Sequence, residues 1–357
     1  MNEEIEGDSA GETLENLKNT VTDVLRNRGN SKLLSYKADV YEEPVWITNR
    51  QFQDYVTVGQ KDAFDYLSVY FNVKDDNHPP VHFMLLHAMS SVFRGTLSPW
   101  LGCSINLVCL GITLWLLLRL GRQLADVFSL EGKGRQLGIL AVLLYGMSTG
   151  ALATVLLIRM YGLVSCLCVA LFSVHVEKWK NNGFDKKNKG LIAITVLGFL
   201  TQYFFLFYCL LLAAVTAVIL LYRHRNKELW CYIRSMVIAA VIGLVLFPFA
   251  ISDVFSSGRG TEALGNLASG FAGYGQRLAA FGRILADRTV GAPLLTGGCA
   301  AGAILLLGKL YLSFRAGKQE QKGENSGRDA AWMLMVPVAG YFLLASRMSP
   351  YLVDRYI

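Results

Sequence analysis

The sequence predicts an all-α polytopic membrane protein, and both composition and residue order indicate this fold class. Hydrophobic residues make up 53% of the 357 residues and charged residues only 17%, a polar share too small to cover a soluble protein of this length. After residue 80, the apolar residues form long blocks that short basic loops separate. Blocks of this kind are typical of helices that cross a lipid bilayer.

The first 80 residues differ in charge from the rest of the chain, and we expect them to form an extracytoplasmic head. They hold 15 acidic and 8 basic residues, against 12 acidic and 26 basic residues afterwards. Apolar side chains at helical spacing predict a short amphipathic helix over 14–25, and aromatic residues among acids in 31–80 indicate a folded extramembrane loop. Because no signal peptide follows Met1, we expect a transmembrane helix upstream of it. The chain also stops at Ile357 without a closing helix, so we expect further chain beyond this residue.

The apolar blocks after the head predict about eight spans. Residues 81–93 are too few to cross a bilayer, so this stretch is expected to be interfacial or re-entrant. Two later spans are short and are expected to pack against neighbouring helices or to join their successors through a broken turn near Thr201-Gln202-Tyr203. The predicted spans cover roughly 98–118, 136–149, 151–176, 191–200, 203–222, 231–251, 293–314 and 331–346.

The basic loops orient these spans in the plasma membrane. If eight spans alternate, 18 of the 26 basic residues after position 80 fall on one side, which the positive-inside rule assigns to the cytoplasm. The head, the 252–292 loop and residues 347–357 then lie outside. Since membrane topology accounts for the basic pI of about 9.0, we predict no nucleic-acid partner.

The densest polar cluster lies where the head meets the membrane, at Asp75–His82. Pro79 and Pro80 fix an extended turn there and stop any helix from upstream. A carboxylate and an imidazole on such a turn can move a proton or bind a divalent cation. We therefore predict Asp76 and His78 as catalytic residues and as possible ligands of a divalent metal. The alternative is a solvated turn before an ordinary helix.

Two further clusters share the exterior side. Arg159 and Tyr161 are predicted to lie roughly eight residues inside a span, where an unpaired arginine costs about 2.5–3.5 kcal/mol. An anionic ligand or an acid of the head would offset that cost. Arg355 and Tyr356 form the last cluster, unless they are simple anchors at the membrane edge. We predict that these four residues bind the phosphate of a lipid donor, while a carboxylate takes a proton from the acceptor hydroxyl.

Several of these residues carry a family resemblance. The segment Asp76–His87, with the letters DNHPPVHFMLLH, resembles the D-x-H-P-P segment of GT-C fold glycosyltransferases of the protein-mannosyltransferase/ArnT-like superfamily. Three later segments resemble family motifs in the family's order: Arg159-Met160-Tyr161, Thr201-Gln202-Tyr203-Phe204 and Tyr351–Tyr356. Gln202 stands where the family has a histidine. The resemblance covers about residues 50–357.

The resemblance implies a GT-C-like transmembrane bundle that uses a polyprenyl-phosphate sugar as donor. The acceptor would be an extracytoplasmic lipid, glycan or protein, and the active site would lie at the outer face under the first loop. Family members carry a catalytic acidic pair at the start of that loop, and no Asp-Glu pair of this chain matches it. Two alternatives stay open, an inactive relative that binds lipid-linked sugar and a transporter of a lipid-linked precursor.

The orientation predicts how single cysteines introduced into the full-length protein react on intact cells. Cysteines in the head or in the 252–292 loop should react with an impermeant thiol reagent, because both segments lie outside. Cysteines in 178–189 or 315–328 should react only after permeabilisation. The opposite pattern would place the predicted site on the cytoplasmic side.

Overall fold

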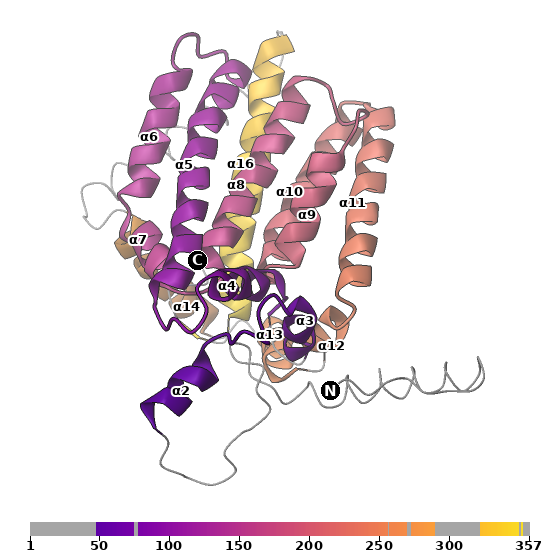
Figure 1. Cartoon of the computed structure of the whole chain (residues 1–357). Coiled ribbons are helices and arrows are strands. Elements are labelled where there is room, and N and C mark those ends of the chain that lie inside the picture. Colours follow the sequence, from indigo (N-terminus) through magenta and orange to yellow (C-terminus); the bar gives the residue numbers. More distant parts are fainter. Residues whose placement is uncertain are drawn as a thin grey trace, which may run out of the picture. The chain divides into compact units, whose positions relative to one another are not determined.

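The computed structural model describes residues 48–74, 78–255, 257–269, 273–289, 322–349 and 351–352, and all regular elements in them are helices (Figure 1). Two compact units divide the chain between Leu101 and Gly102, and each is described by itself. The predicted helix over 14–25 and the predicted span over 293–314 lie outside the described residues.

The N-terminal unit contains short helices with clear sequence signals at their starts. Helix α2 (Asn49–Val56) begins with a capping box in which Thr48 and Gln51 bond reciprocally. Helix α3 (Tyr66–Asn72) begins where the Asp65 carboxylate accepts the Ser68 N–H at 3.0 Å. Helix α4 (Val81–Val92) follows Pro80 and has 12 residues, fewer than a span needs. Its length agrees with the interfacial or re-entrant helix that the sequence predicts.

A buried polar contact joins α4 to the segment before α3. The Phe64 N–H donates to Ser91 Oγ at 2.9 Å, and this bond holds Phe64 at a φ of 60°, which is unfavourable for a bulky residue. Ser91 Oγ lies 3.4 Å from His87 Nε2, and the Tyr66 ring packs edge-on against the imidazole. Burial lowers the pKa of His87 below its ordinary value of 6.5, although Asp65 and Asp62 oppose the shift.

This shift predicts that the N-terminal unit loses stability in mild acid. Because the folded pKa of His87 is lower than the unfolded one, the stabilisation is complete above pH 6.5 and declines as the pH falls towards the folded pKa. Hydrogen exchange of the α3 and α4 amides in the full chain, corrected for intrinsic rates, should therefore accelerate at low pH. In His87→Leu the acceleration should disappear. If the acceleration persists in that variant, another group causes it.

The second unit is a bundle whose helices run side by side in Figure 1. Among the described residues, five helices are long and apolar enough to cross a membrane, and a sixth span results if the bent pair α6 and α7 counts as one. The fold class is therefore confirmed as an α-helical, multi-pass membrane protein. The helices of the bundle are α5 (Trp100–Val127), α6 (Gly134–Gly146), α7 (Thr149–Leu156), α8 (Tyr161–Lys180), α9 (Lys189–Phe199), α10 (Phe204–Tyr222), α11 (Asn226–Leu246) and α16 (Lys322–Met348).

The structure corrects one predicted span and agrees with one predicted break. Residues 151–176 do not form one helix, because the chain leaves α7 after Leu156 and starts α8 only at Tyr161. Helix α7 instead bends by 60° from α6. The break near Thr201–Tyr203 is present, since α9 has only 11 residues and ends at Phe199.

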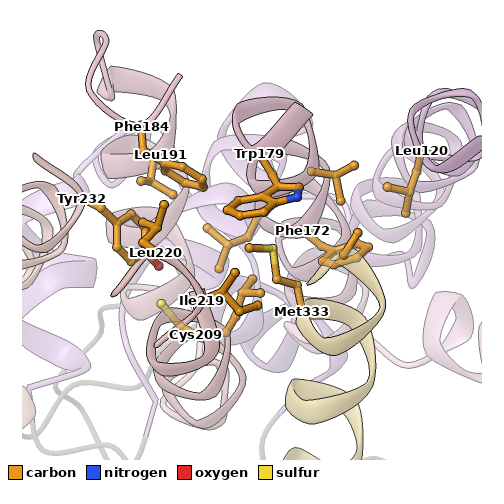
Figure 2. Close-up of a cluster of buried hydrophobic side chains, with 14 of the residues drawn as sticks. Leu120, Phe172, Trp179, Phe184, Leu191, Cys209, Ile219, Leu220, Tyr232 and Met333 are labelled. Carbon is orange, nitrogen blue, oxygen red and sulfur yellow. The ribbon is translucent and has the colours of Figure 1, made fainter. Parts of the chain in front are cut away.

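The basic loops that follow α5, α8 and α10 lie at the same end of the bundle (Figure 1). Ion pairs tie the helices together there: Lys180 Nζ lies 2.5 Å from Asp126 Oδ2, and Arg223 binds Asp329 with two bonds of 2.9 and 3.0 Å. An apolar cluster lies beside them and includes Phe172, Trp179, Ile219 and Met333 (Figure 2). We call this end the basic-loop end.

Three further helices of the described ranges lie at the opposite end of the bundle (Figure 1). They are α12 (Ala250–Phe255), α13 (Gly258–Ala268) and α14 (Tyr274–Thr289). The Thr149 hydroxyl at the start of α7 donates to the carbonyls of Asp287 and Arg288 at 3.1 Å each, so α7 binds the C-terminal end of α14. We call this end the helical-cap end.

Candidate functional site

The break between α7 and α8 is built around a buried asparagine. Asn106 comes from the interior of α5 and is completely inaccessible. Its Nδ2 donates to the Leu157 carbonyl at 2.7 Å and to the Thr154 carbonyl at 3.2 Å. These carbonyls belong to the end of α7, where a helix leaves its last acceptors without partners. The Asn106 carboxamide therefore supplies a donor to carbonyls that the end of α7 would otherwise leave unpaired within the helix.

Two glycines allow the break to pack closely against α5. A Cβ added to Gly102 would lie 2.1 Å from Ile158 Cγ2, and one added to Gly162 would lie 2.8 Å from Asn106 Oδ1. Any larger residue at either position would therefore push the break away from α5.

The break places Arg159 at a helix start and not inside a span. Its side chain is exposed, and its N–H donates to the Leu157 carbonyl at 2.7 Å. Within the described ranges, the guanidinium forms no ion pair. The predicted position eight residues deep in a span is wrong, because α7 ends at Leu156 and α8 starts only at Tyr161.

The start of α8 adds to the positive electrostatic potential around Arg159. No side chain caps the helix at Met160, and Tyr161, which is half-buried, is its first residue. An uncapped helix N-terminus presents backbone N–H groups and a partial positive charge. Helix α8 has 20 residues and ends at Lys180, so its start lies about 30 Å away from the basic-loop end. The arrangement can hold an anion at the helical-cap end.

A cavity of about 410 Å³ lies at the same end, between α13, α14 and the end of α16. Arg277 and Arg347 both line it, together with Asn266, Tyr274 and Gln276. Arg277 Nε donates to the Ser346 carbonyl at 2.6 Å.

Backbone carbonyls and an aromatic ring orient the two guanidinium groups of this cavity. Arg277 also donates to the Ser349 carbonyl, and Arg347 donates to the Ser269 carbonyl. The Arg347 guanidinium lies 5.2 Å from the centre of the Tyr274 ring, whose hydroxyl donates to Leu343 O at 2.8 Å. These bonds fix the orientation of both guanidinium groups at the edge of the cavity.

The helical-cap end also contains a buried carboxylate. The Tyr203 hydroxyl donates to Asp253 Oδ2 at 2.6 Å, and Asp253 is 5% exposed. This contact ties α12 to the start of α10. Gln202 is also buried at the preceding turn, and its neighbour Thr201 donates from Oγ1 to the Leu197 carbonyl at 2.7 Å.

The predicted site residues have different outcomes. Asp76, Arg355 and Tyr356 lie outside the described residues. His78 is half-buried and precedes α4 in the N-terminal unit, whereas Arg159 and Tyr161 belong to the second unit. Across the described ranges, no group of three or more His, Cys, Asp and Glu side chains could hold a metal ion.

Sequence reasoning missed Arg277 and Asn106. Arg277 lies in the segment 252–292, which the sequence predicts as an exterior loop and the structure folds partly into α13 and α14. The helical spacing of apolar residues over 274–289 was the signal for α14. Asn106 is a polar residue within an apolar block, and that contrast was the available signal.

Comparisons with protein-family models, with curated proteins and with solved structures found no match to this chain.

The role of Asn106 predicts a large stability cost for Asn106→Leu. The variant removes the carboxamide donor from the Thr154 and Leu157 carbonyls and leaves the Leu157 carbonyl only the Arg159 N–H, which we expect to cost about 1–3 kcal/mol. Thr113→Val is the matched control, because Thr113 is also buried in α5 but donates within its own helix, to the Cys109 carbonyl. Thermal unfolding in detergent should show a clearly larger loss for Asn106→Leu. Equal losses would contradict the capping role.

Proposed function

We propose that this protein is a membrane glycosyltransferase that moves a sugar from a polyprenyl-phosphate donor to an extracytoplasmic acceptor. One observation carries the proposal. Arg159 is exposed at the uncapped start of α8, at the end of the bundle opposite the basic loops. By the positive-inside rule that end faces outward, where a lipid-linked donor would present its phosphate.

The chemistry of this position suits the departure of a lipid phosphate. As the glycosidic bond breaks, negative charge develops on the phosphate, and a guanidinium together with helix N–H groups would stabilise it. Arg159 supplies a planar fork for two phosphate oxygens. We propose Tyr161, Arg355 and Tyr356 as further donor contacts, and the motif segments given above support this assignment.

The acceptor side of the reaction requires a base. In the proposal, Asp76 takes the proton from the acceptor hydroxyl, and His78 orients the carboxylate or shares that proton. A divalent cation could bind to the same two residues, and the protein would then use it to polarise the acceptor oxygen.

The proposal predicts different effects for two substitutions of Arg159. Since the guanidinium is exposed and forms no ion pair in the described ranges, both Arg159→Lys and Arg159→Ala should insert and fold normally. Lysine retains the charge but not the planar fork, so Arg159→Lys should bind the donor roughly tenfold more weakly, a loss of about 1.4 kcal/mol. Arg159→Ala should lose more.

The measurement is sugar transfer by membranes that contain the full-length protein. A panel of radiolabelled polyprenyl-phosphate sugars serves as donor, and the donor KM is compared between variants. Arg135→Lys is the matched control, because Arg135 is exposed at the basic-loop end. Transfer with an unchanged donor KM in Arg159→Lys would remove the phosphate role of Arg159. Lack of transfer with every donor would contradict the enzymatic function itself.

A further inference from the structure

Two exposed cations on neighbouring helices have no role in the proposed function. Lys189 is the first residue of α9, and Arg234 lies in the first half of α11; both side chains are exposed. We propose that these two residues bind the phosphate of an anionic phospholipid from the leaflet at the basic-loop end. The inference does not depend on the proposed reaction, which assigns no role to either residue.

A buried contact places Lys189 and Arg234 at the same level of the bundle. Asn188 Nδ2 donates to Ser235 Oγ at 2.8 Å, and these two residues are the immediate chain neighbours of the pair. Helices α9 and α11 lie side by side, and both start at the basic-loop end (Figure 1). Each residue turns a helix by about 100°. The residue after the contact on α9 and the residue before it on α11 therefore lie on the same side of the helix pair.

The loop before α9 adds positive charge and is held against α11. Lys186 and Lys187 of this loop are exposed. The buried Phe184 anchors the loop, because its N–H donates to Glu228 Oε2 at 3.1 Å and its ring packs edge-on against Tyr232. The lysines are thus positioned before a ligand binds, which lowers the entropy cost of binding.

This surface offers its charge to an anion and not to a zwitterion. Among the described residues, none of the four cations named above forms an ion pair. The acids of segments 181–189 and 226–234 are already paired, Asp185 with Lys227 at 3.4 Å and Glu228 with Arg225 at 2.6 Å. A headgroup that carries an ammonium group would therefore meet only cations and paired acids. A lipid with a net negative charge fits this surface better.

The position of Arg234 indicates that the anion comes from the bilayer. Arg234 shares a stripe of α11 with Trp230, Val237 and Val241, all of them exposed on a span-length helix. Tryptophan is typical of the membrane–water interface, and Arg234 lies about one turn further into the span. Side chains of a helix point towards its start, so the guanidinium reaches back to the level of the headgroups. A lipid phosphate is the anion present at that depth.

The first test removes the pair and compares the result with an equal loss of charge elsewhere. The site variant is Lys189→Gln/Arg234→Gln. The control is Lys133→Gln/Arg135→Gln, because both of its residues are also exposed at the basic-loop end. The full chain is placed in nanodiscs of phosphatidylcholine and phosphatidylglycerol, and native mass spectrometry counts the retained lipids of each kind. The preference for phosphatidylglycerol should fall at least roughly tenfold in the site variant and less than roughly twofold in the control.

The second test adds a negative charge and retains both cations. A Cβ added to Gly190 would have no neighbour within 4 Å beyond its own stretch of helix, and an acid in the first turn of α9 suits the helix dipole. Gly190→Glu should therefore fold, and its preference for phosphatidylglycerol should fall roughly fivefold. Gly190→Gln is the control, because it has the same shape without the charge, and it should keep the preference.

Two results would contradict the lipid site directly. These are an equal fall in both double variants and an unchanged preference in Gly190→Glu. A further arm titrates phosphatidylcholine nanodiscs with glycerol 3-phosphate. Saturable binding there that Lys189→Gln/Arg234→Gln abolishes would identify a soluble ester as the ligand, and this result would also overturn the inference.

Discussion

The bundle depends on one requirement of the lipid environment, which is that every backbone polar group inside it must have a partner. The carboxamide of Asn106 meets this requirement at the end of α7, where it binds the carbonyls of Thr154 and Leu157. The Arg159 N–H also donates to the Leu157 carbonyl, so a side chain and a backbone donor together satisfy the chain where α7 ends. The start of α8, and with it the position of Arg159, follows from this helix end.

The two ends of the bundle use charge in different ways. At the basic-loop end, arginines and lysines pair with acids, as in Arg223 with Asp329 and Lys180 with Asp126. At the helical-cap end, Arg277 and Arg347 bind neutral carbonyls instead. Paired charges stabilise contacts between helices, whereas the bonds of Arg277 and Arg347 to carbonyls fix the orientation of their guanidinium groups. The two ends of the bundle therefore differ in the groups that their arginines bind.

The sequence predicted the fold class because long apolar blocks leave few alternatives, and it located the break near Thr201 because Thr, Gln and Tyr interrupt such a block. The break at Leu157–Met160 was hidden, since apolar residues continue through it and its cause, Asn106, lies about 50 residues away in the chain. The sequence identified Arg159 as an unusual residue, but it did not predict that Arg159 lies at the start of a helix. Arg277 was missed because its neighbours in the cavity come from α13 and α16, and sequence spacing does not show that proximity.

Helix α14 is attached at both of its ends, to α16 through Arg277 and to α7 through the carbonyls of Asp287 and Arg288. The two attachments are about ten residues apart, or roughly 15 Å along the helix. One residue inserted between them would rotate one attachment by about 100° relative to the other, so only one could survive. We therefore expect α14 to tolerate substitutions but not insertions or deletions between its two attachments. Most segments outside the core of a protein tolerate both.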